Sequence, residues 1–372
     1  MSLDEGVLVK RTLNFTEIGK KLGFTVQQFD VVTQDGYILK LFHIPGNRNK
    51  PVLLMHGIID SSDTFIIREK SSLAIALANS GYDVWLGNNR GNRYSRHHVY
   101  LNPDRDDKFW DFSFHELGYY DLPAIIDFIL NKTGQKKLTA IGHSQGNAIF
   151  LVLGATRPEY NDKIKLLISL SPVCFLNNLM DAPYLLLKSV PTLSNVMTLL
   201  GQEEFMGDNT TFIRVFREIC GTENSYSLCA HGILFPMAGS DPEELEPEFL
   251  PTIIAHYPTG TSKKNAIHLS QVGIQGLFSE FDYNWRNMDI YNSTMPPEYN
   301  LSKVTMRVAL VAGRNDKLST LKDVDLLNRK LPNVVEYLII KRRKFSHLDA
   351  VWGRNMDKYL FPHIFKILAK YS

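Results

Sequence analysis

The chain has 372 residues, of which 44% are hydrophobic and 22% are charged, and its formal net charge is +2. This composition is typical of a soluble globular protein that is long enough for one large domain with a sizeable insertion. The small net charge argues against a nucleic-acid partner. No apolar run approaches the roughly 18 residues of a membrane span, so we also expect no transmembrane segment.

Eight segments rich in apolar and β-branched residues predict strands. They span 24–33, 37–44, 51–55, 82–86, 138–141, 165–170, 307–312 and 334–340. Asp35-Gly36 between the first two predicts a hairpin, which would form an antiparallel edge. Helical patterns alternate with the later strands. They cover 69–79, 115–132, 147–155, 318–330 and 356–369. This alternation predicts an α/β fold with a mostly parallel eight-stranded sheet and helices on both faces.

The turn after the fifth predicted strand carries the clearest chemical signal in the chain. Gly142-His-Ser-Gln-Gly146 fits the G-x-S-x-G pattern. A strand before this pattern and a helix after it form the context of a nucleophile elbow. The two glycines suit a turn so tight that a Cβ beside its apex would collide. Ser144 is therefore predicted to be a catalytic nucleophile.

A nucleophilic serine needs a histidine base and a carboxylate that orients the histidine, in the chain order Ser, Asp or Glu, His. Asp316 and His347 each follow one of the last two predicted strands, where these partners are required. Asp323 and Asp325 compete with Asp316, but both fall inside the following helix. His363 lies in the terminal helix, so His347 is the predicted base.

The oxyanion that forms during acyl transfer needs backbone N–H donors. The N–H of Gln145, directly after the nucleophile, is predicted to be one of them. The loop after strand 51–55 would supply the second, which we assign to the N–H of Ile58, while the His56 side chain holds that loop. No Cys/His spacing resembles a metal-ligand set, so we expect neither a metal ion nor a cofactor.

About 130 residues separate the sixth and seventh predicted strands, which is too long for a simple connection. We predict a mainly helical cap over residues 174–303, inserted between core segments 1–173 and 304–372. Its first part is rich in large apolar residues, most of which we expect to pack the cap onto the core. They are Leu176, Leu179, Met180, Leu185, Leu186, Leu187, Val190, Leu193, Val196, Met197, Leu199 and Leu200. Such residues over a catalytic serine also suit an apolar acyl pocket or an interface-contacting surface.

Cysteines, glycosylation sequons and the chain start bear on the cellular compartment. The odd number of cysteines argues against a disulfide-built fold, although Cys220 and Cys229 enclose a short loop and could form one bridge. Five N-x-[ST] sequons favour the secretory route. They begin at Asn14, Asn131, Asn209, Asn292 and Asn300. Residues 1–6 show no signal-peptide pattern, so we expect either a cytosolic chain or a sequence without its native beginning.

Together these motifs resemble the acid lipase family, which includes gastric lipase and lysosomal acid lipase. The likeness runs from Val31 to Gly353, nearly the whole chain. The diagnostic pieces are His56-Gly57, Gly87–Asn92, Tyr120–Pro123, Asn131–Gln135, Gly142–Gly146, Gly260–Ser262, Ser270-Gln271 and His347–Asp349. The resemblance implies an α/β-hydrolase core with a cap and lid. It also implies hydrolysis of triacylglycerols or cholesteryl esters in a secreted or lysosomal setting.

Matched by position, the resemblance supports the same catalytic triad and oxyanion donors. It further implies a Cys220–Cys229 disulfide and glycosylation at Asn131. The chain departs from the family pattern at Ile58-Ile59, where members often have Leu-Leu, and at Ser346, where members often have an acidic residue. Thr320 stands where a second aspartate is common. These departures leave the catalytic groups in place but could change the pH optimum.

We therefore predict a serine ester hydrolase, a monomer that acts on neutral lipid esters at an oil–water or membrane interface. Two alternatives stay open. The first is an esterase or thioesterase for small soluble acyl substrates. The second is a catalytically silent lipid carrier that keeps the cap pocket. A comparison of short-chain and long-chain esters would separate the first from a lipase, and labelling of Ser144 would exclude the second.

Overall fold

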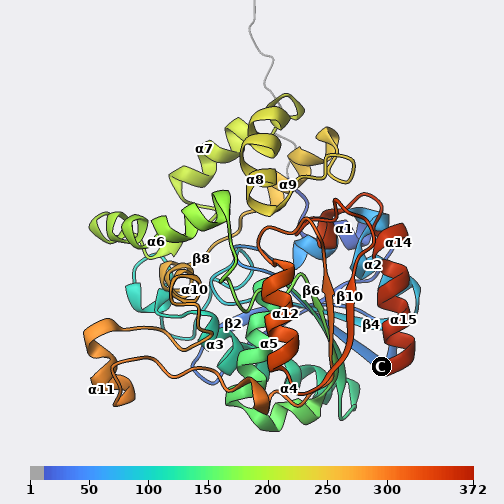
Figure 1. Cartoon of the computed structure of the whole chain (residues 1–372). Coiled ribbons are helices and arrows are strands. Elements are labelled where there is room, and N and C mark those ends of the chain that lie inside the picture. Colours follow the sequence, from blue (N-terminus) through green and yellow to red (C-terminus); the bar gives the residue numbers. More distant parts are fainter. Residues whose placement is uncertain (1–11) are drawn as a thin grey trace, which may run out of the picture.

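The computed structural model describes residues 12–372, so the segment 1–6, on which the signal-peptide expectation rests, lies outside the described residues. An eight-stranded sheet forms the centre of the molecule (Figure 1). Its strands, in spatial order, are β1 (Gln27–Val32), β2 (Ile38–Ile44), β4 (Tyr82–Gly87), β3 (Asn47–Met55), β5 (Leu138–His143), β6 (Ile164–Leu170), β9 (Val308–Ala312) and β10 (Val334–Ile339). The pairs β1–β2 and β2–β4 are antiparallel, and the other neighbours are parallel. The predicted sheet is confirmed.

Helices cover both faces of this sheet, as the alternating pattern predicts. One face carries α2 (Leu73–Asn79), α13 (Asp349–Trp352), α14 (Met356–Tyr359) and α15 (Phe361–Tyr371). The other carries α4 (Leu122–Thr133), α5 (Gln145–Thr156) and α12 (Leu321–Lys330). Side chains alternate between the two cores along each strand: Val52 and Leu54 enter the first, whereas Leu53 and Met55 enter the second. The parallel strands are therefore apolar on both faces, which explains their nearly continuous hydrophobic runs.

Several predicted helices have different bounds in the structure. The segment 69–79 divides into a 3-10 turn, Glu69–Ser71, and α2, because Ser72 between them is extended. The segment 115–132 is divided as well. It comprises α3 (Phe114–Glu116), a π-helical stretch over Leu117–Asp121, and α4. The final helix is divided at Leu360, which separates α14 from α15. A short helix, α1 (Phe15–Lys21), precedes the sheet.

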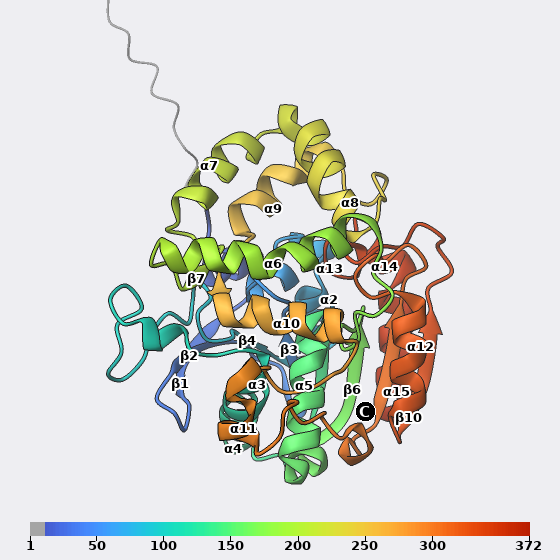
Figure 2. The ribbon, with the colours of Figure 1, turned by 60° about the vertical axis from the view of Figure 1, so that its left-hand side comes forward.

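The long segment between β6 and β9 is mainly helical, as predicted. Its helices are α6 (Asp181–Leu199), α7 (Thr211–Cys220), α8 (Phe235–Ala238), α9 (Leu250–His256), α10 (Lys263–Gln275) and α11 (Asn287–Tyr291). It also holds a two-residue antiparallel pair, β7 (Glu204–Phe205) with β8 (Thr261–Ser262), which the sequence did not predict. Most of the insertion lies above the ends of the parallel strands, with α6 packed along α10 (Figure 2).

The expectation that most apolar residues early in the insertion pack onto the core is wrong. Four of the twelve are buried: Leu176, Leu179, Leu187 and Met197. Seven are exposed, namely Met180, Leu185, Leu186, Leu193, Val196, Leu199 and Leu200. The helix α6 packs against α10 and α8, and these contacts cover only part of its apolar surface.

A disulfide joins Cys220, the last residue of α7, to Cys229, and Cys174 is a buried free thiol. The bridge closes a short loop inside the insertion and anchors α7 to the following π-helical stretch, Ser227–Leu234. None of the helices formed by residues 12–372 combines the length and apolar character that crossing a membrane requires.

Candidate active site

Ser144 lies at the apex of the turn between β5 and α5, in a strained backbone conformation with φ 54° and ψ −124°. The flanking glycines are required by close approaches. A Cβ on Gly142 would lie 2.5 Å from Asn147 Oδ1, inside the turn itself. A Cβ on Gly146 would lie 2.4 Å from the carbonyl oxygen of Met55, at the end of the neighbouring strand β3. Gly146 therefore allows the start of α5 to lie close to the end of the neighbouring strand β3.

His347 and Asp316 are brought together by the loops that follow β10 and β9. Nδ1 of His347 lies 2.9 Å from Oδ2 and 3.1 Å from Oδ1 of Asp316. The carboxylate also accepts the backbone N–H groups of Leu318 and Ser319, at 2.9 and 2.7 Å. These bonds hold residues 316–319 in a turn, so α12 begins three residues later than the sequence predicts. Because Nδ1 of His347 donates to Asp316, its Nε2 is left as the basic atom.

His143, the variable residue before Ser144, braces the loop that carries His347. Its Nε2 donates to the carbonyl oxygen of His347 at 3.1 Å, and the two rings lie 4.8 Å apart. Burial and the neighbouring His347 hold the pKa of His143 well below its usual range. The ring is therefore neutral, and its one N–H is on Nε2, the nitrogen that donates to the carbonyl oxygen of His347.

The loops that carry the two expected oxyanion donors meet at Ser144. Gln145 is the first residue of α5, so its N–H has no partner within the helix and lies at the positive end of the helix dipole. The loop after β3 approaches closely as well, since a Cβ on Gly57 would lie 3.1 Å from Cβ of Ser144. Ile58, the assigned second donor, follows directly.

The His56 side chain holds this loop, as expected from the sequence. Its Nδ1 lies 2.8 Å from the carbonyl oxygen of Gly57, and its Nε2 accepts the backbone N–H of Asn89 at 3.2 Å and lies 3.1 Å from Nδ2 of Asn92. Burial lowers the pKa of His56 to about 4. A neutral His56 therefore ties the loop after β3 to the loop after β4.

The site is closed in this conformation. Ser144 is 7% exposed and His347 is 3% exposed. The insertion contributes to this closure, because the N–H of His347 donates to the carbonyl oxygen of Ala238, in α8, at 3.1 Å. Little of either side chain is therefore open to solvent in this conformation.

Two buried aspartates near the site carry raised pKa values. Burial raises the pKa of Asp60 and that of Asp349 to about 8. Asp60 accepts the N–H of Ser61 at 2.7 Å, and Asp349 accepts the N–H of Ser346 at 2.6 Å. Both groups are therefore largely protonated at neutral pH, one next to the loop after β3 and the other beside the loop of His347.

The free energy of unfolding should be larger at pH 6.5 than at pH 8. Asp60 and Asp349 bind protons more tightly in the folded chain than in the unfolded chain, where their pKa is near 3.9. Their contribution is complete below pH 4 and is lost as the pH rises through 8. Burial lowers the pKa of His56 to about 4 and that of His268 to about 3. These histidines bind protons more tightly in the unfolded chain, so they lower the free energy of unfolding only below their unfolded pKa of about 6.5. Denaturant titrations at both pH values measure the difference.

The double variant Asp60→Asn with Asp349→Asn is the control for this pH dependence. Asparagine keeps an acceptor of similar shape but does not titrate, so the difference between pH 6.5 and pH 8 should shrink. Equal stability of the original chain at the two pH values would contradict the assignment.

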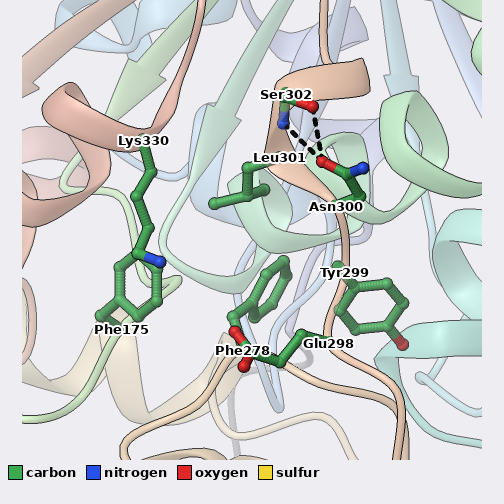
Figure 3. Close-up of a pocket in the computed structure, with 8 residues that line it drawn as sticks. All are labelled: Phe175, Phe278, Glu298, Tyr299, Asn300, Leu301, Ser302 and Lys330. Atoms are coloured by element: carbon green, nitrogen blue, oxygen red, sulfur yellow. Dashed lines mark hydrogen bonds between the residues drawn. The ribbon is translucent and has the colours of Figure 1, made fainter.

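The five sequon asparagines, Asn14, Asn131, Asn209, Asn292 and Asn300, are all exposed, and glycosylation stays a prediction. Asn300 borders a pocket of about 310 Å³ whose walls include the rings of Phe175, Phe278 and Tyr299 (Figure 3). Oδ1 of Asn300 accepts from the N–H and the hydroxyl of Ser302, at 3.1 and 2.6 Å. The residues that line this pocket include none of the candidate triad or oxyanion residues.

Two residues that contact the site from far along the chain were not predicted from the sequence. Asn265, in α10, is hydrogen-bonded to Gln145, and Thr259 is hydrogen-bonded to Ile59. Neither lies in a motif with chemical meaning of its own. The only available signal was Gly260–Ser262, which matches the family pattern without an assigned role.

Two family models match the chain. The alpha/beta hydrolase fold matches residues 50–351, and a partial alpha/beta-hydrolase lipase region matches residues 15–69. The chain belongs to the α/β-hydrolase lipases. The eight-stranded sheet and the helical insertion are those of this fold.

Curated relatives of this lipase cover almost all of its length. Lipase 1 of Drosophila melanogaster is 38% identical over 96% of this chain and 80% of its own length. Gastric triacylglycerol lipase of Bos taurus is 35% identical over 96% of this chain and 92% of its own. Lipase member K of Homo sapiens is 34% identical over 96% of this chain and 91% of its own. The resemblance found in the sequence is confirmed, and the protein is a carboxylic ester hydrolase.

Solved structures resemble this lipase in fold alone. A thermophilic esterase from Thermogutta terrifontis has a TM-score of 0.54 at 13% identity and covers 93% of this chain and 100% of its own. A lipase from Acinetobacter baumannii described as putative has the same TM-score at 14% identity and covers 95% of each chain. Such low identities carry no statement about substrates.

Proposed function

We propose that this lipase hydrolyses neutral lipid esters, such as triacylglycerols or cholesteryl esters, through an acyl-enzyme on Ser144. The observation that carries the proposal is the 2.9 Å contact between His347 Nδ1 and Asp316 Oδ2, with the His347 ring against the His143 ring next to the serine. A histidine oriented by a buried carboxylate beside a strained serine is the arrangement that activates a hydroxyl.

In the first half of the reaction, Ser144 Oγ attacks the ester carbonyl while Nε2 of His347 takes the hydroxyl proton. Asp316 stabilises the resulting imidazolium, and the N–H groups of Ile58 and Gln145 bind the oxyanion. Collapse of the tetrahedral intermediate breaks the ester C–O bond, and His347 transfers its proton to the leaving alcohol. In the second half, His347 takes a proton from water, which attacks the acyl carbonyl. Collapse of this second tetrahedral intermediate breaks the bond to Ser144 Oγ, which receives the proton from His347, and the fatty acid is released.

The exposed apolar surface of the insertion supports a lipid substrate. On α7, Phe212, Val215 and Ile219 are 64%, 51% and 51% exposed. Their spacing places them on one side of the helix, whereas Ile213 and Cys220 are buried on another. Water does not favour such an exposed apolar stripe, but an oil–water or membrane interface does.

The closed site supports the same interpretation. Residues 174–303, between core segments 1–173 and 304–372, act as a cap in this proposal. Contact of α6 and α7 with a lipid interface stabilises a displaced position of the cap, in which Ser144 accepts an ester. The apolar side chains then face lipid rather than water, which supplies the free energy for opening.

Replacing Phe212, Val215 and Ile219 by serine in one variant should lower activity on emulsified triolein at least about tenfold. Transfer of each of these apolar side chains from water into lipid contributes about 1.5–3 kcal/mol to binding at the interface, and serine removes that contribution. Hydrolysis of dissolved p-nitrophenyl butyrate should stay within about twofold, since the stripe does not contact the candidate triad. The assay compares both substrates at equal enzyme concentration, and cholesteryl oleate is added to distinguish the two lipid classes.

Trp285→Ser is the matched control, because Trp285 is 81% exposed and lies in the 3-10 turn Asn284–Arg286, outside α6 and α7. Its activity on both substrates should be unchanged. An unaltered triolein rate in the triple variant would contradict interface contact by α7. If the original chain is no faster on emulsions than on soluble esters, the protein is instead an esterase for small acyl substrates.

We also propose a secreted or lysosomal location and a monomeric state. The Cys220–Cys229 disulfide supports an oxidising compartment, as do the exposed sequons. A relative named gastric triacylglycerol lipase supports the same location.

A further inference from the structure

The segment Thr259–Asn265 of the insertion contacts both sides of the proposed oxyanion hole. On one side, the N–H of Thr259 donates to the carbonyl oxygen of Ile59 at 2.9 Å, one residue after the proposed donor Ile58. On the other side, the Asn265 side chain is hydrogen-bonded to the side chain of Gln145, the other proposed donor. One short segment thus touches two residues of the core, Ile59 and Gln145, that are 86 positions apart in the sequence.

The contact between Asn265 and Gln145 is a reciprocal pair of amides. Nε2 of Gln145 donates to Oδ1 of Asn265 at 3.0 Å, and Nδ2 of Asn265 donates to Oε1 of Gln145 at 3.2 Å. Asn265 is 0% exposed and Gln145 is 1% exposed. Each amide satisfies the other, so removal of one leaves a buried donor and a buried acceptor unpaired.

Asn265 is itself held in place by two further neighbours. Its N–H donates to Ser262 Oγ at 2.9 Å, and its Nδ2 lies 3.1 Å from Thr261 Oγ1. The Ser262 hydroxyl in turn donates to the carbonyl oxygen of Phe112, which belongs to the core. Asn265 is therefore fixed relative to the core and can impose an orientation on Gln145.

The loop on the other side stores backbone strain. Ile59 has a φ of 49°, a conformation that a β-branched residue rarely adopts. Strain of this kind persists only where the surroundings hold it, and it concentrates at functional sites. The bond from Thr259, which is fully buried, is a contact that holds Ile59 in this conformation.

We propose that the segment Thr259–Asn265 positions the two oxyanion donors, and that Asn265 is a positioning residue for ester hydrolysis. The inference rests on the proposed serine mechanism. Hydrogen bonds to a developing oxyanion depend on donors placed within about 0.5 Å of the productive geometry, and the amide pair supplies this support for Gln145. If the pair served only to attach the insertion, its loss would lower stability and leave the kcat of the folded enzyme unchanged.

Asn265→Ala should lower kcat for dissolved p-nitrophenyl butyrate about 10- to 100-fold, less than the loss of a whole oxyanion donor, with KM changed less than about threefold. An alkyl trifluoromethyl ketone forms an anionic tetrahedral adduct with a catalytic serine. Its inhibition constant should rise by a similar factor, because the same donors bind its oxyanion.

Asn287→Ala is the matched control. Asn287 is a 1% exposed asparagine of the insertion whose Nδ2 donates to Asp282 Oδ1 at 2.7 Å and to the carbonyl oxygen of Thr294 at 3.0 Å. Its loss should destabilise the fold while kcat and the inhibition constant stay within about twofold of the original values.

Gln145→Met removes the other amide of the pair and is a second test of the same contact. It replaces Asn265→Ala as the test if that variant does not fold. It keeps the elbow backbone and removes the amide, so it should lower kcat as Asn265→Ala does. The double variant should be no slower than the slower single variant, since both remove one interaction. An unchanged kcat in either single variant, or additive losses, would overturn the inference. Turnover retained in Ser144→Ala would instead overturn the proposed mechanism.

Discussion

Ser144→Ala should lower kcat for ester hydrolysis by at least about 10⁴-fold, because no other group at the elbow can form the acyl-enzyme. The residual rate would come from the oxyanion donors and the bound water alone. Ser144 is buried at the apex of the turn, and alanine removes one oxygen without adding volume. The fold should therefore be retained, and the measurement is kcat on p-nitrophenyl butyrate and on emulsified triolein.

Thermal unfolding of the Ser144→Ala variant is the control for its fold. Mass spectrometry after treatment with an alkyl organophosphonate gives an independent measure of the nucleophile. The original chain should gain one phosphonyl group on the peptide that contains Ser144, and the variant should gain none. Substantial turnover in the variant would refute the serine mechanism, and an unlabelled original chain would support the silent lipid carrier instead.

Asp316→Asn should lower kcat by about 10³- to 10⁴-fold, the range that loss of the orienting carboxylate produces in serine hydrolases. Asparagine keeps the volume of the side chain, but it does not stabilise the imidazolium of His347. It can also present its amide N–H to Nδ1, which favours the tautomer with the proton on Nε2 and removes the base. The measurement is kcat for the soluble ester across a range of pH, with KM expected to change little.

Asp323→Asn is the matched control, because Asp323 is equally buried and was the competing candidate in the sequence. Its carboxylate accepts from Asn178 Nδ2 at 2.7 Å and from the Thr320 hydroxyl at 2.9 Å, at the start of α12. The variant should lose some stability and keep its kcat within about twofold. A larger catalytic loss in Asp323→Asn than in Asp316→Asn would contradict the assignment of the acid.

Local patterns were sufficient for the sheet and for the elbow. The central parallel strands contain short apolar runs, and burial on both faces of a parallel sheet favours such runs. The elbow is equally local, since Gly142 and Gly146 allow close approaches that a Cβ would prevent. Helix ends were less predictable. The start of α12, for example, depends on Asp316 accepting the N–H groups of Leu318 and Ser319.

The sequence could not say which apolar residues of the insertion are covered. Leu187 and Leu185 are the same residue type two positions apart in α6, yet one is 8% exposed and the other 67%. The difference arises because Leu187 packs against Gly273 of α10, whereas Leu185 remains exposed on the same helix. Burial of this kind depends on where a second helix lies, and hydrophobicity along one segment does not encode that position.

The sequence by itself determined the fold class, the lipase resemblance and the candidates Ser144 and His347, because these follow from short motifs and from their order after successive strands. The preference for Asp316 over Asp323 also came from the sequence, but only the tertiary structure showed the contact of Asp316 with His347 and placed Asn265 against Gln145. These are hydrogen bonds between residues 31 and 120 positions apart in the sequence. Their existence depends on distances of about 3 Å, which the packing of the sheet, its helices and the insertion decides.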